Sequence, residues 1–280
     1  MTTATPDLRG QIAVVTGASR GVGKGIALGL GEAGATVYVT GRTVDEATSP
    51  RPGTIGKTAE EVTNAGGRGI AVRCDHASDD EVVALFQRVR KEQGRVDVLV
   101  NNAFSVPETP IFGGKFWEYP VGLWDQLFHV GCRGQYVASH TVAPMMVAQG
   151  RGLIVNVSSF AGKGYVFNVA YGVGKAAVDR MAKDMAVELG PHGVTCVSLW
   201  PGVVRTEYLV EASSRGEVPF AIVNGESPQF SGRAVAAFAA DPKREEKNGQ
   251  VLIVAEVARQ YGFTDIDGRQ PGGIRQQMSP

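Results

Sequence analysis

Short apolar runs alternate along the chain with stretches that have the spacing of amphipathic helices. The apolar runs predict strands at residues 11–16, 36–40, 69–74, 96–100, 153–157, 194–199 and 251–254. Their nearly continuous hydrophobicity is typical of parallel strands that are covered on both faces. Because strands and helices alternate, we expect an α/β fold with a doubly wound parallel sheet of about seven strands, formed by residues 1–280 as a single domain.

Three segments depart from this alternation. Residues 104–120 carry several aromatic side chains among Pro and Gly, so this aromatic insert either packs on the domain or lines an apolar pocket. Residues 206–230 follow the carboxyl end of a predicted strand, where ligands bind in such sheets, and we expect an irregular substrate loop from Glu207 to Phe230. Residues 255–280 form a tail that contains Gly and Pro.

Two helices carry further expectations. Asp79 is predicted to be the N-cap of the helix that follows the third strand. A long helix is predicted from Val121 to Gln149, and its apolar residues are spread over more than one face. This distribution favours a helix that takes part in an oligomer interface.

Charge and cysteine content exclude several classes of protein. The 280 residues include 28 Lys and Arg and 28 Asp and Glu, without a basic run, so we expect neither a nucleic-acid partner nor a membrane-surface patch. No apolar run approaches the ~20 residues that span a bilayer, and the N-terminus does not resemble a signal peptide. The three cysteines are far apart and predict reduced thiols, not disulfides or a metal site. We therefore expect a cytoplasmic protein without a membrane span.

A glycine-rich turn, Gly17–Gly23, connects the first predicted strand to the first predicted helix. At this position glycines allow backbone N–H groups to approach a pyrophosphate at the positive end of the helix, as in Rossmann-like domains. Arg42 follows the second strand, where NAD-binding folds often place a carboxylate for the ribose 2′-hydroxyl. With Arg20 as a second cation, the sequence favours NADP(H) over NAD(H), whose 2′-hydroxyl needs no cation.

The stretch from Leu153 to Lys175 predicts a strand, a serine-containing loop and a helix. Tyr171 and Lys175 are four residues apart, so both side chains lie on one helix face. Such a pair is also common on solvated helix faces. If a neighbouring serine shares their pocket, the group forms a proton-transfer site.

Five motifs, in order, resemble the short-chain dehydrogenase/reductase family: T-G-A-S-R-G-V-G at residues 16–23, N-N-A at 101–103, V-S-S at 157–159, Y-G-V-G-K at 171–175 and P-G-V-V-R-T at 201–206. The tail sequence A-R-Q-Y-G-F-T-D-I-D-G-R is similar to the dehydrogenase/reductase member 1 subgroup, associated with NADPH-dependent reduction of steroid and xenobiotic carbonyls. The resemblance implies a Rossmann-like fold, a nicotinamide cofactor and a homodimer or homotetramer.

The resemblance also implies roles for individual residues. Tyr171 is the implied general acid, Lys175 its cationic neighbour, and Ser159 the serine that holds the substrate oxygen. Ser159 is chosen because x-A-G follows it, although Ser158 has the more usual spacing to Tyr171. The predicted substrate residues are Phe104, Phe167 and Tyr208. The predicted cofactor residues are Gly17, Ser19, Arg20, Gly21, Val22, Gly23, Arg42, Asp75, Asn102, Ala103, Tyr171, Lys175, Pro201, Gly202, Val204 and Thr206.

Three departures from the family pattern are visible. Gly131 stands where the family has the Asn of its proton relay, Phe104 replaces a glycine after N-N-A, and the D-G-G pattern after the last strand is absent. The leading prediction is an NADP(H)-dependent oxidoreductase that acts on a carbonyl or secondary alcohol of an apolar substrate. The alternatives are an NADPH-binding, sensor-like protein with little catalysis and an NAD-dependent alcohol dehydrogenase.

Overall fold

The computed structural model describes residues 6–107, 111–218 and 222–272. Parts of the predicted domain, aromatic insert, substrate loop and tail (residues 1–5, 108–110, 219–221 and 273–280) lie outside these ranges. The strands pair in parallel in the order β3-β2-β1-β4-β5-β6-β7. Their bounds are β1 Ile12–Val15, β2 Thr36–Gly41, β3 Arg68–Arg73, β4 Val98–Asn101, β5 Gly152–Val157, β6 Val194–Trp200 and β7 Val251–Ile253.

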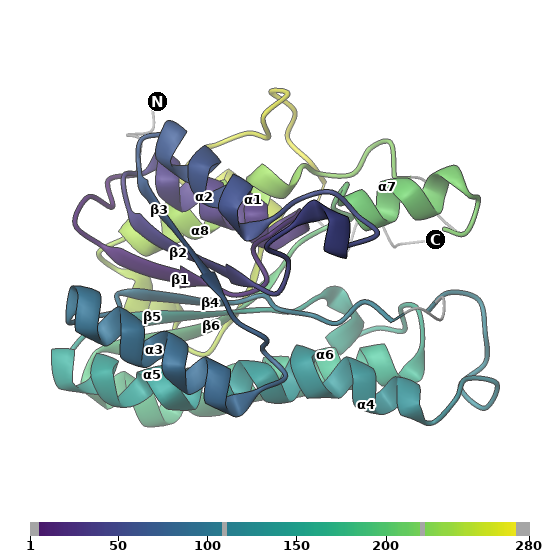
Figure 1. Ribbon diagram of the computed structural model, residues 1–280, viewed down its shortest axis with the longest axis horizontal. Coiled ribbons are helices and arrows are strands. Elements are labelled where there is room, and N and C mark those ends of the chain that lie inside the picture. Colours follow the sequence, from purple (N-terminus) through teal and green to yellow (C-terminus); the bar gives the residue numbers. More distant parts are fainter. Residues whose placement is uncertain (1–5, 108–110, 219–221, 273–280) are drawn as a thin grey trace.

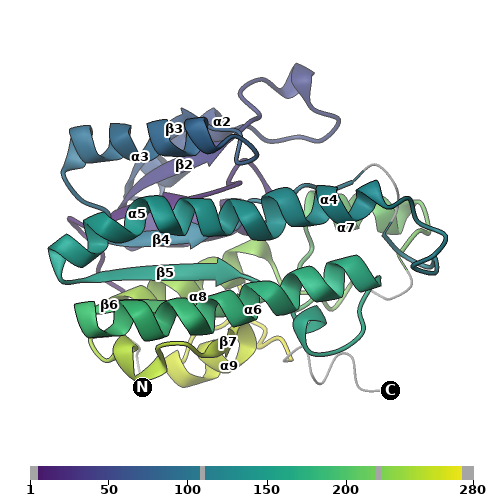
Figure 2. The ribbon, with the colours of Figure 1, turned by 90° about the horizontal axis from the view of Figure 1, so that it is seen from below.

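Helices cover both faces of this sheet. Helices α1, α2 and α8 lie on one face, and α3, α5 and α6 lie on the other (Figure 1). Figure 2 shows the molecule from the side of α3, α5 and α6, with the strands behind these helices. The helices are α1 Gly21–Glu32, α2 Ile55–Asn64, α3 Asp79–Gln93, α4 Gly122–Phe128, α5 Gln135–Gln149, α6 Val169–Leu189, α7 Glu207–Ser214, α8 Pro228–Ala240 and α9 Val254–Tyr261. This arrangement confirms the predicted α/β fold with a doubly wound parallel sheet.

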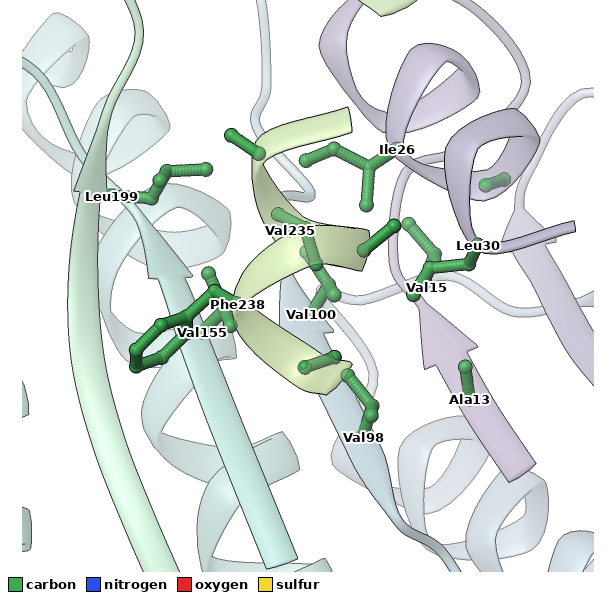
Figure 3. Packing of buried hydrophobic residues seen from close by; sticks show 14 of the residues in the cluster. Ala13, Val15, Ile26, Leu30, Val98, Val100, Val155, Leu199, Val235 and Phe238 are labelled. Atoms are coloured by element: carbon green, nitrogen blue, oxygen red, sulfur yellow. The ribbon is translucent and has the colours of Figure 1, made fainter. Parts of the chain in front are cut away.

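The core explains why the strands are apolar along their whole length. Val15, Val100, Val155 and Leu199 point from four neighbouring strands towards α1 and α8 (Figure 3). All residues of β1, β4, β5 and β6 are buried, as expected for a sheet that is covered on both faces. The strand order reverses between β1 and β4, and the crevice at this switch point positions the candidate site.

Several local predictions were wrong. Ser78, not Asp79, is the N-cap of α3, because its hydroxyl accepts the Glu81 N–H while Asp79 is already helical. Part of the stretch predicted to be irregular is helical: α7 begins directly after Thr206, whose hydroxyl accepts the Leu209 N–H, and α8 contains Phe230. The seventh strand ends one residue early, because Val254 already starts α9 within the predicted tail.

The predicted long helix from Val121 to Gln149 has the expected extent but not one uniform hydrogen-bond pattern. Helix α4 passes into a π-helical turn, His129–Gly134, and then into α5, so the ladder changes register at Gly131. Figure 2 shows this run beside α6. Among the described residues, none of the helices combines the length and apolarity needed to cross a bilayer.

Candidate active site

The glycine-rich turn packs directly against the segment after β4. A Cβ on Gly17 would lie 2.7 Å from the Ala103 Cα, and a Cβ on Gly23 would lie 2.3 Å from the Asn102 Nδ2. The Asn102 amide donates to the carbonyls of Thr16 and Gly17 at 2.9 and 3.0 Å. Glycine is therefore required here for close approach, and Asn102 and Ala103 support the turn.

The start of α1 fits the pyrophosphate of a dinucleotide. The N-cap residue, Arg20, makes no side-chain hydrogen bond to the first turn, where backbone N–H groups point towards the site of an anion. One of them, Gly21 N–H, donates to the Glu207 carboxylate at 2.9 Å. The sequence reading missed Glu207, because its contact with the turn depends on helix α7 folding back over the sheet.

The two arginines predicted to meet a 2′-phosphate have different surroundings. The Arg20 guanidinium donates to the carbonyls of Pro52 and Gly53 at 2.9 and 2.8 Å and to the Ser49 hydroxyl at 3.0 Å. Arg42 is exposed at the end of β2 and has no carboxylate partner in the part of the chain that the structure describes. Arg20 therefore holds the loop after β2, while the Arg42 charge is available to a ligand.

A cavity of about 590 Å³ opens at the carboxyl ends of β4, β5 and β6, a size typical of small-molecule sites. It brings together eleven of the predicted residues: Val22, Asn102, Phe104, Ser159, Phe167, Tyr171, Lys175, Pro201, Gly202, Val204 and Thr206. Leu209, Asn224 and Gly225 also line it; the sequence marked their segment as a substrate loop without singling them out. The other predicted residues lie outside the lining: Gly17, Ser19, Arg20, Gly21, Gly23, Arg42, Asp75, Ala103 and Tyr208.

Tyr171 and Lys175 face this cavity from the first turns of α6. Asn168 caps the helix by accepting the Tyr171 N–H at 2.9 Å. The buried Lys175 ammonium donates to the Val157 carbonyl at 3.1 Å, which fixes it beneath the end of β5. Helix and strand thus hold the two side chains in one pocket, as their spacing suggested.

The two neighbouring serines make different contacts. Ser158 is buried and its hydroxyl donates to the Lys175 carbonyl at 3.1 Å. The Ser159 hydroxyl accepts the Ala161 N–H at 3.0 Å, and Ser159 lowers the pKa of the Tyr171 phenol. Ser159 is therefore the serine beside the phenol, while Ser158 ties the loop to α6.

Burial dominates the electrostatics of the pair. It raises the pKa of the Tyr171 phenol above its usual value, and the hydrogen bond with Ser159 opposes this rise. It lowers the pKa of Lys175 to about 8, and the charges of Asp179 and Cys132 act in the opposite direction. A further cation beside the phenol would lower the phenol pKa towards neutrality.

The Phe104 ring occupies the space beside Gly131. A Cβ on Gly131 would lie 2.8 Å from this ring, which meets Tyr171 edge-on at 5.9 Å and lies 5.2 Å from the Lys175 ammonium. The cavity that remains behind Tyr171 measures about 10 Å³, near the smallest volume that holds one water. An aromatic ring, not an open water site, therefore faces Gly131.

The other two predicted substrate residues belong to one aromatic wall. Phe112 contacts Phe167 edge-on at 4.8 Å and stacks against Tyr208 at 6.4 Å. Phe167 has a φ of 65°, a conformation that bulky residues rarely adopt. Tyr208 lies outside the cavity lining, and the Arg51 guanidinium lies over its ring at 4.9 Å.

The remaining predicted residues shape the loops around the cavity. Val204 pairs with Glu226 in a parallel bridge, and the Gly202 N–H donates to the Glu226 carboxylate at 3.0 Å. Asp75 accepts the Ala77 N–H at 3.0 Å in the turn before α3. The buried Ser19 accepts a hydrogen bond from Thr58 at its carbonyl. These contacts fix the loop backbone.

Comparisons with known proteins show the family to which the chain is related. The family model described as short chain dehydrogenase matches residues 11–216. Dehydrogenase/reductase SDR family member 1 of Mus musculus is 47% identical over 274 residues, which cover 94% of this chain and 85% of the mouse protein. A short-chain type dehydrogenase/reductase from Mycobacterium marinum has a TM-score of 0.75 and 29% identity, covering 88% of this chain and 94% of its own. A metagenomic short-chain oxidoreductase in complex with NADP has a TM-score of 0.70 and 32% identity, covering 88% of this chain and 97% of its own.

Proposed function

The chain belongs to the short-chain dehydrogenase/reductase family of oxidoreductases that act on CH–OH groups, and within it we propose an NADP(H)-dependent carbonyl reductase of apolar ketones or aldehydes. The observation that carries the proposal is the convergence of Ser159, Tyr171 and Lys175 in the cavity that Val22 of the glycine-rich turn also lines. A proton donor thereby faces the space beside the start of α1. Hydride and proton delivery to a carbonyl require this arrangement.

In the proposed reaction, bound nicotinamide supplies hydride to the carbonyl carbon. Tyr171 donates its phenolic proton to the carbonyl oxygen, and Ser159 positions that oxygen by a hydrogen bond. Lys175 places a positive charge below the phenol and favours the phenolate that proton donation leaves behind. Phe104 excludes water from the inner side of the pair.

The preference for NADP(H) rests on Arg42. An exposed guanidinium without a carboxylate partner among the described residues suits a 2′-phosphate, with which it can form charge-assisted hydrogen bonds. The NADP complex of the metagenomic relative supports the same choice. An NAD-dependent alcohol dehydrogenase is the alternative within the family.

The apolar substrate class rests on the cavity wall. Phe104, Val166, Phe167 and Leu209 line it, and the polar side chains of the lining include the candidate catalytic Ser159, Tyr171 and Lys175. A steroid- or xenobiotic-like ketone has the matching chemistry, with one carbonyl on a hydrophobic body. Action in the cytoplasm as a homodimer or homotetramer is part of the same proposal.

The proposal is tested by steady-state kinetics with a panel of apolar ketones and aldehydes. NADPH oxidation should be observed with at least one carbonyl, and kcat/KM should be higher with NADPH than with NADH. Tight NADPH binding without oxidation across the panel would support the sensor-like alternative. A higher kcat/KM with NADH would support the NAD-dependent alternative.

A further inference from the structure

Asp179 is a partly buried carboxylate next to the candidate catalytic pair, one helical turn after Lys175 on α6. Its Oδ1 accepts two hydrogen bonds, from the Ser198 hydroxyl at 2.5 Å and the Trp200 indole at 2.9 Å. Its Oδ2 lies so close to the backbone of Gly162 that a Cβ there would approach it to 2.3 Å. The carboxylate therefore joins α6 to β6 and to the serine loop.

The contact with Trp200 continues towards Ser159. Trp200 meets Phe160 edge-on at 6.0 Å, and Phe160 begins the turn that follows Ser159. Asp179 thus reaches Ser159 through two packed rings.

The charge of Asp179 also faces Lys175. Burial lowers the pKa of Lys175, and Asp179 is the first group that opposes this effect. Cys132, from the π-helical turn, is the second, and Tyr171 is the remaining titratable neighbour on α6. Among the described residues, no carboxylate forms an ion pair with Lys175, so the charge of Asp179 acts without holding the ammonium.

We propose that Asp179 is a positioning residue of the active site, which orients the serine loop through Trp200 and places its negative charge one helical turn from the Lys175 ammonium. The proposal rests on the proposed function, because it assigns Asp179 a task in the proton transfer of Tyr171. Asp179 does not contact the reacting atoms and acts through other residues.

Asp179→Asn separates the charge from the hydrogen bonds. The Asn Oδ1 can accept from Ser198 and Trp200 as the carboxylate does. The variant should fold normally. The Lys175 titration and the alkaline limb of the pH–kcat profile should both move to lower pH by roughly one unit.

The pKa of Lys175 is measured directly by NMR on protein that carries carbon-13-labelled lysine. The signal of the Lys175 side chain is the one that disappears in the Lys175→Arg variant. Asp184→Asn is the matched control, because it removes an exposed carboxylate from the same helix, where Asp184 pairs with Arg180. This control should leave the titration and the profile unchanged. Trp200→Phe should lower kcat several-fold without shifting the Lys175 titration or the pH–kcat profile.

An unchanged Lys175 titration in Asp179→Asn would overturn the proposal. A lower kcat with an unmoved pH profile would also overturn it, because that result indicates a purely structural role. If the wild-type enzyme reduces no carbonyl, the proposed function fails. The NMR titration still decides whether Asp179 controls Lys175.

Discussion

Phe104 and Gly131 are complementary residues at the centre of the site. Each departs from the family pattern, and the sequence alone showed both departures. It did not show that the ring of one occupies the space left by the other, because their contact depends on the π-helical turn. For the serines the sequence contained two signals: the x-A-G that follows Ser159 favoured Ser159, and the spacing to Tyr171 favoured Ser158.

Gly131→Ala should destabilise the protein, because the new Cβ would lie 2.8 Å from the Phe104 ring. Overpacking of this kind costs about 1–3 kcal/mol in the free energy of unfolding. Gly122→Ala is the matched control, because a Cβ there meets nothing within 4 Å. Thermal unfolding measures both variants. Equal melting temperatures for Gly131→Ala and the wild type would show that the ring moves aside freely.

Arg42→Ala should reduce kcat/KM with NADPH by roughly 10- to 100-fold, the effect of losing a charge-assisted hydrogen bond. The value with NADH should change little, because NADH has no 2′-phosphate. Arg259→Ala, at an exposed position on α9, is the control. An equal loss with both cofactors would show that Arg42 acts on the fold and not on the phosphate.

At the level of elements, α7 connects the two halves of the site. Its Glu207 carboxylate meets the glycine-rich turn, and its Glu211 forms an ion pair at 3.0 Å with Arg51 from the loop after β2. The sequence placed a substrate loop here but not a helix. The helix could not be predicted because its stability comes from these tertiary contacts, and only Ala212 of its eight residues is buried.

Glu207→Gln should tighten NADPH binding. The carboxylate lies at the helix start where a pyrophosphate would bind, and a charge near a helix N-terminus is worth about 0.3–1 kcal/mol. The dissociation constant, measured by fluorescence titration, should therefore fall about two- to fivefold. Glu217→Gln, which removes an exposed partner of Arg215, should leave it unchanged. Weaker binding by Glu207→Gln would mean that the carboxylate supports the bound state.

At the level of the whole molecule, the sheet was the most predictable feature. Each buried parallel strand has a nearly continuous apolar sequence, so the pattern alone located every strand of the described sheet. The tail was not predictable in the same way. Asp265 of the tail accepts the Ser227 N–H at 2.8 Å, a contact between segments that no local pattern reveals.

Glu226 should make the stability of the molecule depend on pH. Burial raises the pKa of this carboxyl from 4.5 to about 8, the Gly202 N–H opposes the rise, and Asp265 adds to it. The folded state therefore binds a proton that the unfolded state releases above about pH 4.5. The stabilisation that this bound proton gives to the folded state is complete below about pH 4.5 and is lost as the pH rises through about 8.

Glu226→Gln removes this titration. The free energy of unfolding of the variant relative to the wild type should rise by on the order of 3 kcal/mol between pH 4.5 and pH 8. Urea unfolding at several pH values measures how the free energy of unfolding of each protein depends on pH. Glu256→Gln, which changes an exposed carboxylate on α9, is the control. A parallel pH dependence in Glu226→Gln and wild type would contradict the assignment.

The central claim is that Tyr171 delivers the proton in an NADPH-dependent carbonyl reduction. The most direct test compares Tyr171→Phe with the wild type, using the best ketone of the panel for turnover and NADPH titration for binding. Tyr171→Phe should lose turnover by about 100-fold or more, as expected on removal of a general acid, while NADPH binds as before. Substantial turnover by Tyr171→Phe would contradict the account.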